Sequence, residues 1–255
     1  MSNIIACRLG CYAGFADRAW THMPEVGLRH LEIDVPSAAE VEPLQRRLSE
    51  SGVSISSMQG DLKIQQNDIV DQLGPQLETM GAFGTVFMFL SVNSGEQDPE
   101  TTWARLRAAG DLAAEHDVTL VLETHPNLIT NGDVARRTMQ QVDHPHVRVN
   151  YDTANVHYYN KNVDSIEELE KVIDYVGAVH LKDSRGGFES FDFPSLGHGI
   201  VDFPKVFELL GGRGFNGPCT MELEGSEDVD RDNEEQVLEH IAESVAYLRQ
   251  IGAMD

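Results

Sequence analysis

The segment VHLKD, residues 179–183, is an apolar stretch that ends in a histidine and then becomes polar at once. This pattern is typical of a buried β-strand, and it puts the imidazole of His180 at the carboxyl end of that strand. In parallel α/β barrels, functional side chains gather at the carboxyl ends of the strands. His180 is therefore the first candidate functional residue.

Three other apolar segments end in acidic side chains in the same way. They are TLVLETH with Glu123, VRVNYD with Asp152, and CTMELEG with Glu222 and Glu224. If the strands close into a barrel, acids from these segments converge with His180. Carboxylate oxygens with one imidazole and no thiolate favour manganese first, then magnesium or cobalt, and allow zinc. The pattern predicts a site for one divalent metal ion.

Strand-like and helix-like segments alternate along the whole chain. Eight apolar strand patterns, from IIACR at residues 4–8 to CTMELE at residues 219–224, are separated by segments with helical periodicity. A chain of 255 residues with 41% hydrophobic residues can bury one large core. These features predict an α/β protein, a single (β/α)8 TIM barrel that forms one domain over residues 1–255.

Local signals mark helix ends and loops. Ser37 and Glu40 match a capping box at the start of one helix, and Gly52 follows its last apolar residue. The Gly-Pro pair at residues 74–75 is expected to kink or split the next helix. The irregular connection over residues 183–202 follows the seventh strand, and a connection this long is usually a lid or a substrate loop.

Charge and composition exclude several classes of protein. Nineteen basic residues stand against 42 acidic ones, and the formal charge of −23 repels nucleic-acid backbones and anionic membranes. Cys7, Cys11 and Cys219 show no paired spacing that would indicate a disulfide framework. No signal peptide or membrane span is evident. We expect a soluble, cytoplasmic protein without nucleic-acid or membrane partners, and the sequence leaves open whether it forms a homo-oligomer.

Each candidate strand end carries a second polar residue on the same face, because side chains alternate along a strand. The pairs are Glu123 with His125, His180 with Lys182, and Glu222 with Glu224. We expect Lys182 and His125 to face substrate, whereas parity alone does not choose between Glu222 and Glu224 as a ligand. Each residue also has a purely structural alternative. A single acid at a strand end is commonly solvated or salt-bridged, and His125 or His198 could form a hydrogen bond with a loop instead of contacting substrate.

Several motifs in the second half of the chain resemble one known family. LVLETHPN, NYDTANVH, VHLKDSRGG, PSLGHGIVDFPKVFELL and GPCTMELEG are similar to the sugar phosphate isomerase/epimerase family, the xylose isomerase-like TIM barrels that include tagatose and psicose 3-epimerases. The first half resembles the family only through its alternation of strands and helices. Each motif is short, but their order along the chain is specific.

The resemblance implies a set of functional residues. In that family a Glu, an Asp, a His and a second Glu from strands five to eight bind one divalent metal, and the two glutamates also move protons. The matching positions are Glu123, Asp152, His180 and Glu222. The resemblance therefore implies metal binding by these four residues and catalysis by Glu123 and Glu222.

The predicted substrate contacts lie around these positions. They are His125, Asn155, Lys182, Arg185, His198 and Glu224. Asn155 stands where many relatives have a histidine three residues after the aspartate, and His198 stands in a loop where many have Glu-Gly or Arg-Gly. Lys182 and Arg185 are the cations that could serve a phosphate, but the strong negative charge favours a neutral sugar or polyol.

The implied activity is that of a metal-dependent sugar isomerase or epimerase, which transfers a proton through an enediolate of a ketose, an aldose or a related polyol. Loss of a β-hydroxyl instead would make a dehydratase, a lyase acting on a keto sugar or an inosose. Two other classes remain open. An endonuclease of the abasic-site type would need more histidines and a basic surface, and a barrel can also bind sugar or metal without turnover.

Overall fold

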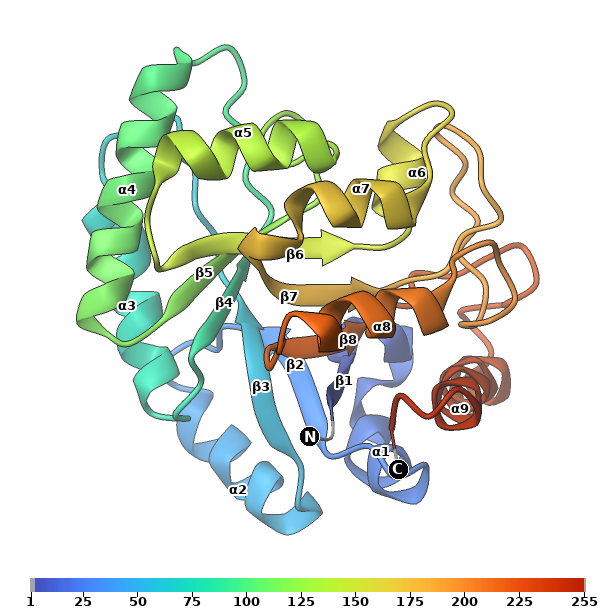
Figure 1. Ribbon diagram of the computed structural model, residues 1–255. Coiled ribbons are helices and arrows are strands. Elements are labelled where there is room, and N and C mark those ends of the chain that lie inside the picture. The colour runs from blue at the N-terminus through green and yellow to red at the C-terminus, as the bar shows by residue number, and fades with distance from the viewer. Residues whose placement is uncertain (1–2, 255) are drawn as a thin grey trace.

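The computed structural model, which describes residues 3–254, is a closed barrel of parallel strands (Figure 1). The strands are β1 Ile4–Arg8, β2 His30–Asp34, β3 Ser54–Gln59, β4 Phe87–Leu90, β5 Thr119–Glu123, β6 Val147–Asp152, β7 Val176–Leu181 and β8 Pro218–Met221. Each strand pairs with the next one in the chain, and β8 pairs with β1 to close the barrel. The predicted (β/α)8 architecture is confirmed.

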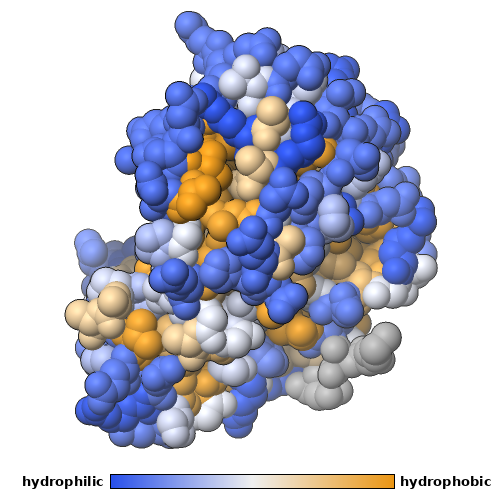
Figure 2. All heavy atoms as spheres, turned by 90° about the vertical axis from the view of Figure 1, so that its left-hand side faces the viewer, coloured by the Kyte–Doolittle hydropathy of each residue, from blue (hydrophilic) through white to orange (hydrophobic). Residues whose placement is uncertain are grey.

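Helices connect the strands and form the outer layer (Figure 1). They are η1 Leu9–Arg18, α1 Ala19–Glu25, α2 Val41–Ser51, α3 Ile69–Gly81, α4 Pro99–Glu115, α5 Gly132–Val142, α6 Asn155–Tyr159, α7 Ser165–Val172, η2 Ile173–Tyr175, α8 Phe203–Gly212 and α9 Glu234–Gln250. On the side of α3 and α4, hydrophilic side chains cover most of the surface, with apolar side chains visible between them (Figure 2). Between residues 3 and 254, no helix has the length and apolar character needed to cross a bilayer.

The helix ends follow the sequence signals only in part. Gly52 ends α2 with a φ of 68°, a left-handed conformation that favours glycine. The expected capping box forms only in part. The amide of Ser37 donates to the Glu40 carboxylate at 2.9 Å, but the Ser37 hydroxyl donates to the same carboxylate and α2 begins only at Val41. Of the two effects expected for the Gly-Pro pair, a kink or a split, the split of α3 is wrong. This helix continues through Pro75, and buried apolar residues on both sides of the proline hold it against the core.

The connection between β7 and α8 lies at the carboxyl ends of the strands and contains no helix (Figure 1). The buried carboxylate of Asp183 holds it together. The amides of Gly197, Gly199 and Val201 donate to this carboxylate at 2.9, 2.8 and 3.2 Å. One side chain at the start of the connection thus fixes the position of its far end.

A buried histidine joins the same connection to α9. His240 Nδ1 lies 2.8 Å from the hydroxyl of Ser195, and that hydroxyl donates to Glu243 at 2.8 Å. Burial, together with the positive charge of Arg231, lowers the pKa of His240 to about 4, although the charge of Glu243 opposes the shift. His240 is therefore neutral in the native protein at pH values where an unfolded chain would already protonate it.

We expect this histidine to reduce the stability of the protein in mild acid. Above the unfolded pKa of 6.5 the group does not lower the free energy of unfolding. The free energy of unfolding then decreases as the pH falls from 6.5 towards the native pKa of about 4, because only the unfolded chain binds the proton. In that window the free energy of unfolding should decrease by about 1.4 kcal/mol per pH unit on account of this group. Urea unfolding at several pH values measures the slope. His240→Asn should lack this component, and His116→Asn, at an exposed position, should keep it; equal slopes in all three proteins would contradict the prediction.

Candidate metal centre

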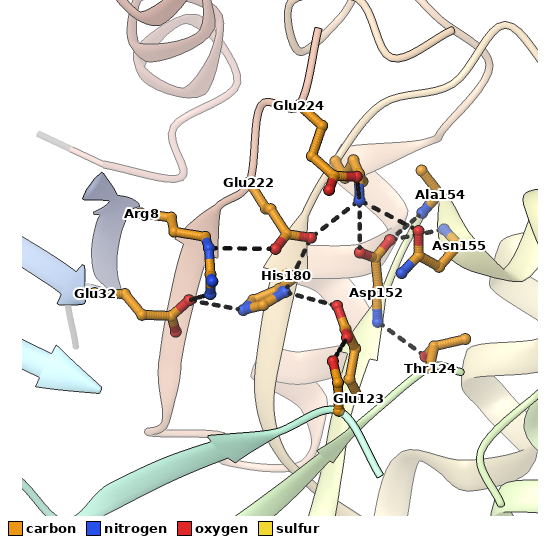
Figure 3. Close-up of polar contacts among 12 residues, drawn as sticks. Arg8, Glu32, Glu123, Thr124, Asp152, Ala154, Asn155, His180, Glu222 and Glu224 are labelled. Carbon is orange, nitrogen blue, oxygen red and sulfur yellow. Dashed lines mark hydrogen bonds and ion pairs between the residues drawn. The ribbon is translucent and has the colours of Figure 1, made fainter. Parts of the chain in front are cut away.

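The carboxyl ends of β5 to β8 bring the four predicted ligands together (Figure 3). Glu123 is the last residue of β5, Asp152 is the last of β6, His180 stands one residue before the end of β7, and Glu222 follows β8. One potential ligand atom from each residue lies within 4.8 Å of those of the other three, and all four side chains are buried. Barrel closure therefore converts four separate strand ends into one cluster.

Both ring nitrogens of His180 face acidic side chains. Nε2 lies 3.1 Å from Oε1 of Glu32, whereas Nδ1 lies 3.5 Å from Oε1 of Glu123 and 3.4 Å from Oε2 of Glu222. Burial lowers the pKa of His180, but the charges of Glu32 and Glu222 outweigh burial and raise it well above its ordinary value. A proton on Nε2 that is held by Glu32 leaves Nδ1 as the nitrogen that can bind a metal.

The two glutamates of the cluster are held in their ionised form. Burial and the charge of Glu222 raise the pKa of Glu123, but the contacts of its carboxylate with His125 and His180 outweigh them and lower it to about 2. Burial also raises the pKa of Glu222, and here the positive charges of Lys182 and His180 prevail and hold it well below its ordinary value. Both side chains are therefore carboxylates at neutral pH.

Two buried atoms of the cluster, Asp152 Oδ2 and His180 Nδ1, make no hydrogen bond and have charged neighbours only at 3.4–3.5 Å. Burial raises the pKa of Asp152 to about 6, despite the charge of Lys182, whose Nζ lies 3.5 Å from Oδ2. Three carboxylates and one imidazole that meet at one buried point fit a divalent cation that prefers oxygen ligands.

Lys182 connects the cluster with its surroundings. Its ammonium group is buried and lies 3.0 Å from Glu222 Oε2 and 3.2 Å from Asn155 Oδ1. It also pairs with Glu224, whose side chain is 43% exposed. Glu224 thus lies nearer to the rim than Glu222, whose side chain is 8% exposed.

Glu123 and Glu222 of the cluster line a cavity of about 470 Å³. Four of the predicted substrate contacts line it, namely His125, Asn155, Lys182 and Glu224. His125 Nδ1 lies 2.6 Å from Glu123 Oε2, so this histidine contacts a predicted ligand. Aromatic side chains form much of the remaining wall.

Arg185 and His198 lie elsewhere. Both line a different cavity, of about 480 Å³, between the β7–α8 connection and α9. Arg185 forms ion pairs with Asp192, at 3.4 Å, and with Asp228. The structure therefore does not bring these two predicted contacts to the cluster.

Two residues from the first strands complete the site, and the sequence analysis missed both. Arg8, at the end of β1, has Nη1 3.1 Å from Glu32 Oε1 and Nε 3.6 Å from Glu222 Oε1 (Figure 3). Glu32, in β2, accepts a hydrogen bond of 2.6 Å from the hydroxyl of Ser57. The available signal was an acid in the middle of an apolar strand, where an unpaired charge would be unfavourable.

The protein is thus a closed (β/α)8 barrel that carries a candidate metal centre, formed by buried acids and a histidine, at the carboxyl ends of its strands. The chain belongs to the xylose isomerase-like TIM barrel family, whose model matches residues 21–251. The resemblance drawn from the sequence motifs is confirmed.

Comparison with individual proteins gives partial matches. The sequence is 30% identical to an L-ribulose-5-phosphate 3-epimerase of Salmonella typhimurium over 120 residues, which are 46% of this chain and 40% of that protein. It is also 30% identical to an inosose dehydratase of Geobacillus thermodenitrificans over 135 residues, 47% of this chain and 45% of that protein. The chain thus matches less than half the length of these curated relatives.

The fold match covers nearly all of both chains. A xylose isomerase-like TIM barrel protein from Mycobacterium smegmatis, whose structure is in complex with magnesium, superimposes with a TM-score of 0.73 and 21% identity. The superposition covers 100% of this chain and 98% of that chain. At this level of identity the match establishes the shared fold.

Proposed function

We propose that this protein is a divalent-metal-dependent sugar isomerase or epimerase that acts on a neutral ketose, aldose or related polyol. The observation that carries the proposal is the buried cluster of three acids and one histidine, of which Glu123 and Glu222 line a 470 Å³ cavity. The partial matches to an epimerase and a dehydratase of sugar-like substrates support the same class of chemistry.

The proposed metal ligands are Glu123, Asp152, His180 and Glu222. Manganese is our first choice, with magnesium, cobalt and zinc as alternatives, because oxygen donors dominate the set. When bound, a divalent cation stabilises the negative charge that develops on substrate oxygens as a neighbouring C–H proton leaves. The buried atoms Asp152 Oδ2 and His180 Nδ1, which make no hydrogen bond, support this assignment.

Glu123 and Glu222 are the proposed proton carriers. Their lowered pKa values keep them ionised at neutral pH, which is the form that a base requires. They come from β5 and β8, which lie three positions apart around the barrel, and so approach the cavity from different sides. Removal by one glutamate and return by the other to the opposite face inverts that carbon, whereas return to the neighbouring carbon interconverts aldose and ketose.

Lys182 and Glu32 position these groups. The Lys182 ammonium lies 3.0 Å from Glu222 Oε2 and holds the carboxylate from the cavity side. Glu32 binds the outer nitrogen of His180 at 3.1 Å and fixes the orientation of its ring. Neither role requires the side chain to change its protonation state.

Solvent exchange tests the proposal directly. Manganese-loaded protein is incubated in deuterated water with a panel of ketoses, aldoses, inositol derivatives and 3-keto sugars, and proton NMR follows the C–H signals. We expect the signal of one carbon next to a carbonyl to disappear, with formation of an epimer or isomer. Loss of a hydroxyl would identify a dehydratase, and the absence of any exchange across the panel would refute proton abstraction.

A further inference from the structure

The ammonium group of Lys182 touches two of the four proposed metal ligands. Nζ lies 3.0 Å from Glu222 Oε2 and 3.5 Å from Asp152 Oδ2, and the Lys182 side chain is only 1% exposed. Lys182 follows His180 by two residues, so both side chains extend from the end of β7 towards the same side. A buried cation of the protein itself is thus in contact with carboxylates that would hold a metal cation.

Three further groups hold the same ammonium, and none of them belongs to the ligand cluster. Nζ lies 3.2 Å from Asn155 Oδ1 and pairs with the carboxylate of Glu224. It also lies 4.7 Å from the centroid of the Phe193 ring, a cation–π contact. If the two ligand carboxylates turned their charge to another cation, Lys182 would therefore still have partners.

The charge of Lys182 matters most for Asp152. Within residues 3–254, Lys182 is the cationic side chain that forms an ion pair with Asp152, which is completely buried. Burial lowers the pKa of Lys182, but the charges of Asp152, Glu222 and Glu224 outweigh burial and raise it well above its ordinary value. Removal of one partner from a buried ion pair is strongly destabilising, because the other charge then stays buried without compensation.

We propose that Lys182 is a built-in counter-cation of the site, which balances Asp152 and Glu222 when no metal is bound and competes with the metal ion for their negative charge. Two positive charges repel each other strongly in a buried site, where the effective dielectric constant is far below that of water. The ammonium therefore lowers metal affinity while it stabilises the protein without metal. This role rests on the metal ligands of the proposed function, but it does not depend on the sugar or on turnover.

The manganese affinity of Lys182→Met measures this competition. Methionine keeps an unbranched apolar side chain and removes the charge. Competition with a chelator of known manganese affinity, followed by the EPR signal of free manganese, gives the Kd. Measurement near pH 8, above the Asp152 pKa of about 6, limits competition by protons. We expect the variant to bind manganese at least about tenfold more tightly than wild type, since a like charge has been removed from beside the ligands.

Lys171→Met is the matched control. It makes the same change of net charge at a lysine that is 35% exposed and pairs with Asp133 and Glu168 at 3.0 and 2.6 Å, outside the cluster. Its manganese affinity should equal that of wild type. A comparable gain in affinity in this control would show a general effect of net charge and would reject the role of Lys182.

Thermal unfolding gives a second readout that does not depend on activity. Without metal, the Tm of Lys182→Met should lie below that of wild type, because Asp152 has lost its ion-pair partner. Manganese should then raise the Tm of the variant by more than it raises that of wild type, since tighter binding to the folded form adds more stability. If the variant does not fold without metal, it is refolded with manganese, and the chelator is added to the loaded protein.

Several outcomes would overturn the counter-cation. Equal or weaker manganese binding by Lys182→Met would reject it, and so would failure of this variant to fold even with manganese. In either case manganese binding by wild type leaves the proposed metal site standing. If neither wild type nor Lys182→Met binds manganese, the metal site of the proposed function is refuted and the role of Lys182 falls with it.

Discussion

Replacing Glu222 by Gln is expected to lower kcat by about 10²–10⁴-fold, the range that a well-placed acid or base contributes. The amide keeps the shape of the side chain but cannot accept a proton. It also removes one of three ligand carboxylates, so metal binding should weaken as well. The fold should persist, because the buried charge of Lys182 still has two partners. These are Asp152, at 3.5 Å, and Glu224.

Glu224→Gln is the matched control for this prediction. Glu224 lies two residues further along, also pairs with Lys182, and does not belong to the cluster of ligand atoms. Its replacement should change kcat and metal content much less. Steady-state kinetics, elemental analysis and far-UV circular dichroism on both variants separate catalysis, metal binding and folding. If Glu224→Gln proves the more damaging in both metal content and proton exchange, then Glu224, and not Glu222, is the ligand and proton carrier.

The second large effect concerns the metal. After loading with manganese, we expect one divalent ion per chain, because four ligand atoms within 4.8 Å of one another define a single site. Chelator should abolish activity, and manganese or cobalt should restore it. Elemental analysis that finds no metal after loading would refute the site.

Variants of the histidine and its partner should reduce metal binding to different degrees. His180→Ala removes the imidazole ligand of the cluster, so the ion should be lost at ordinary metal concentrations. Glu32→Gln leaves the ligands intact but weakens the hold on His180 Nε2, and changes of this kind typically lower metal affinity by about 10–100-fold. His22→Ala removes a buried histidine that contacts Tyr12, away from the cluster, and controls for loss of a buried imidazole. Full metal content in His180→Ala would contradict its role as a ligand.

The sequence by itself determined the barrel and the four strand ends that meet in it. Alternation of apolar strands and helical segments is a local property, readable from each segment alone. Because all strands of a parallel barrel end on the same face, acids at the ends of β5, β6 and β8 had to lie on the side of His180. Because side chains alternate between the two faces of a strand, His125 and Lys182, which lie two residues after Glu123 and His180, could be predicted to face the site.

Other local predictions failed where neighbouring elements decided the outcome. The Gly-Pro pair at residues 74–75 did not break α3, because tertiary packing of the apolar face outweighs the local preference of proline. Arg185 and His198, which were predicted as substrate contacts, line a different cavity from the acid–histidine cluster, between the β7–α8 connection and α9.

Only the tertiary structure decided how residues of β1 and β2 complete the site. Arg8 and Glu32 lie about 150 residues or more before His180 and Glu222 in the sequence, yet they contact them directly. The relative depth of Glu222 and Glu224 was likewise undecided, since both share one face of the strand and differ only in distance from the rim. Sequence periodicity reports which way a side chain points from its own strand. Which side chains then meet depends on the closure and stagger of all the strands together, a property that no single segment carries.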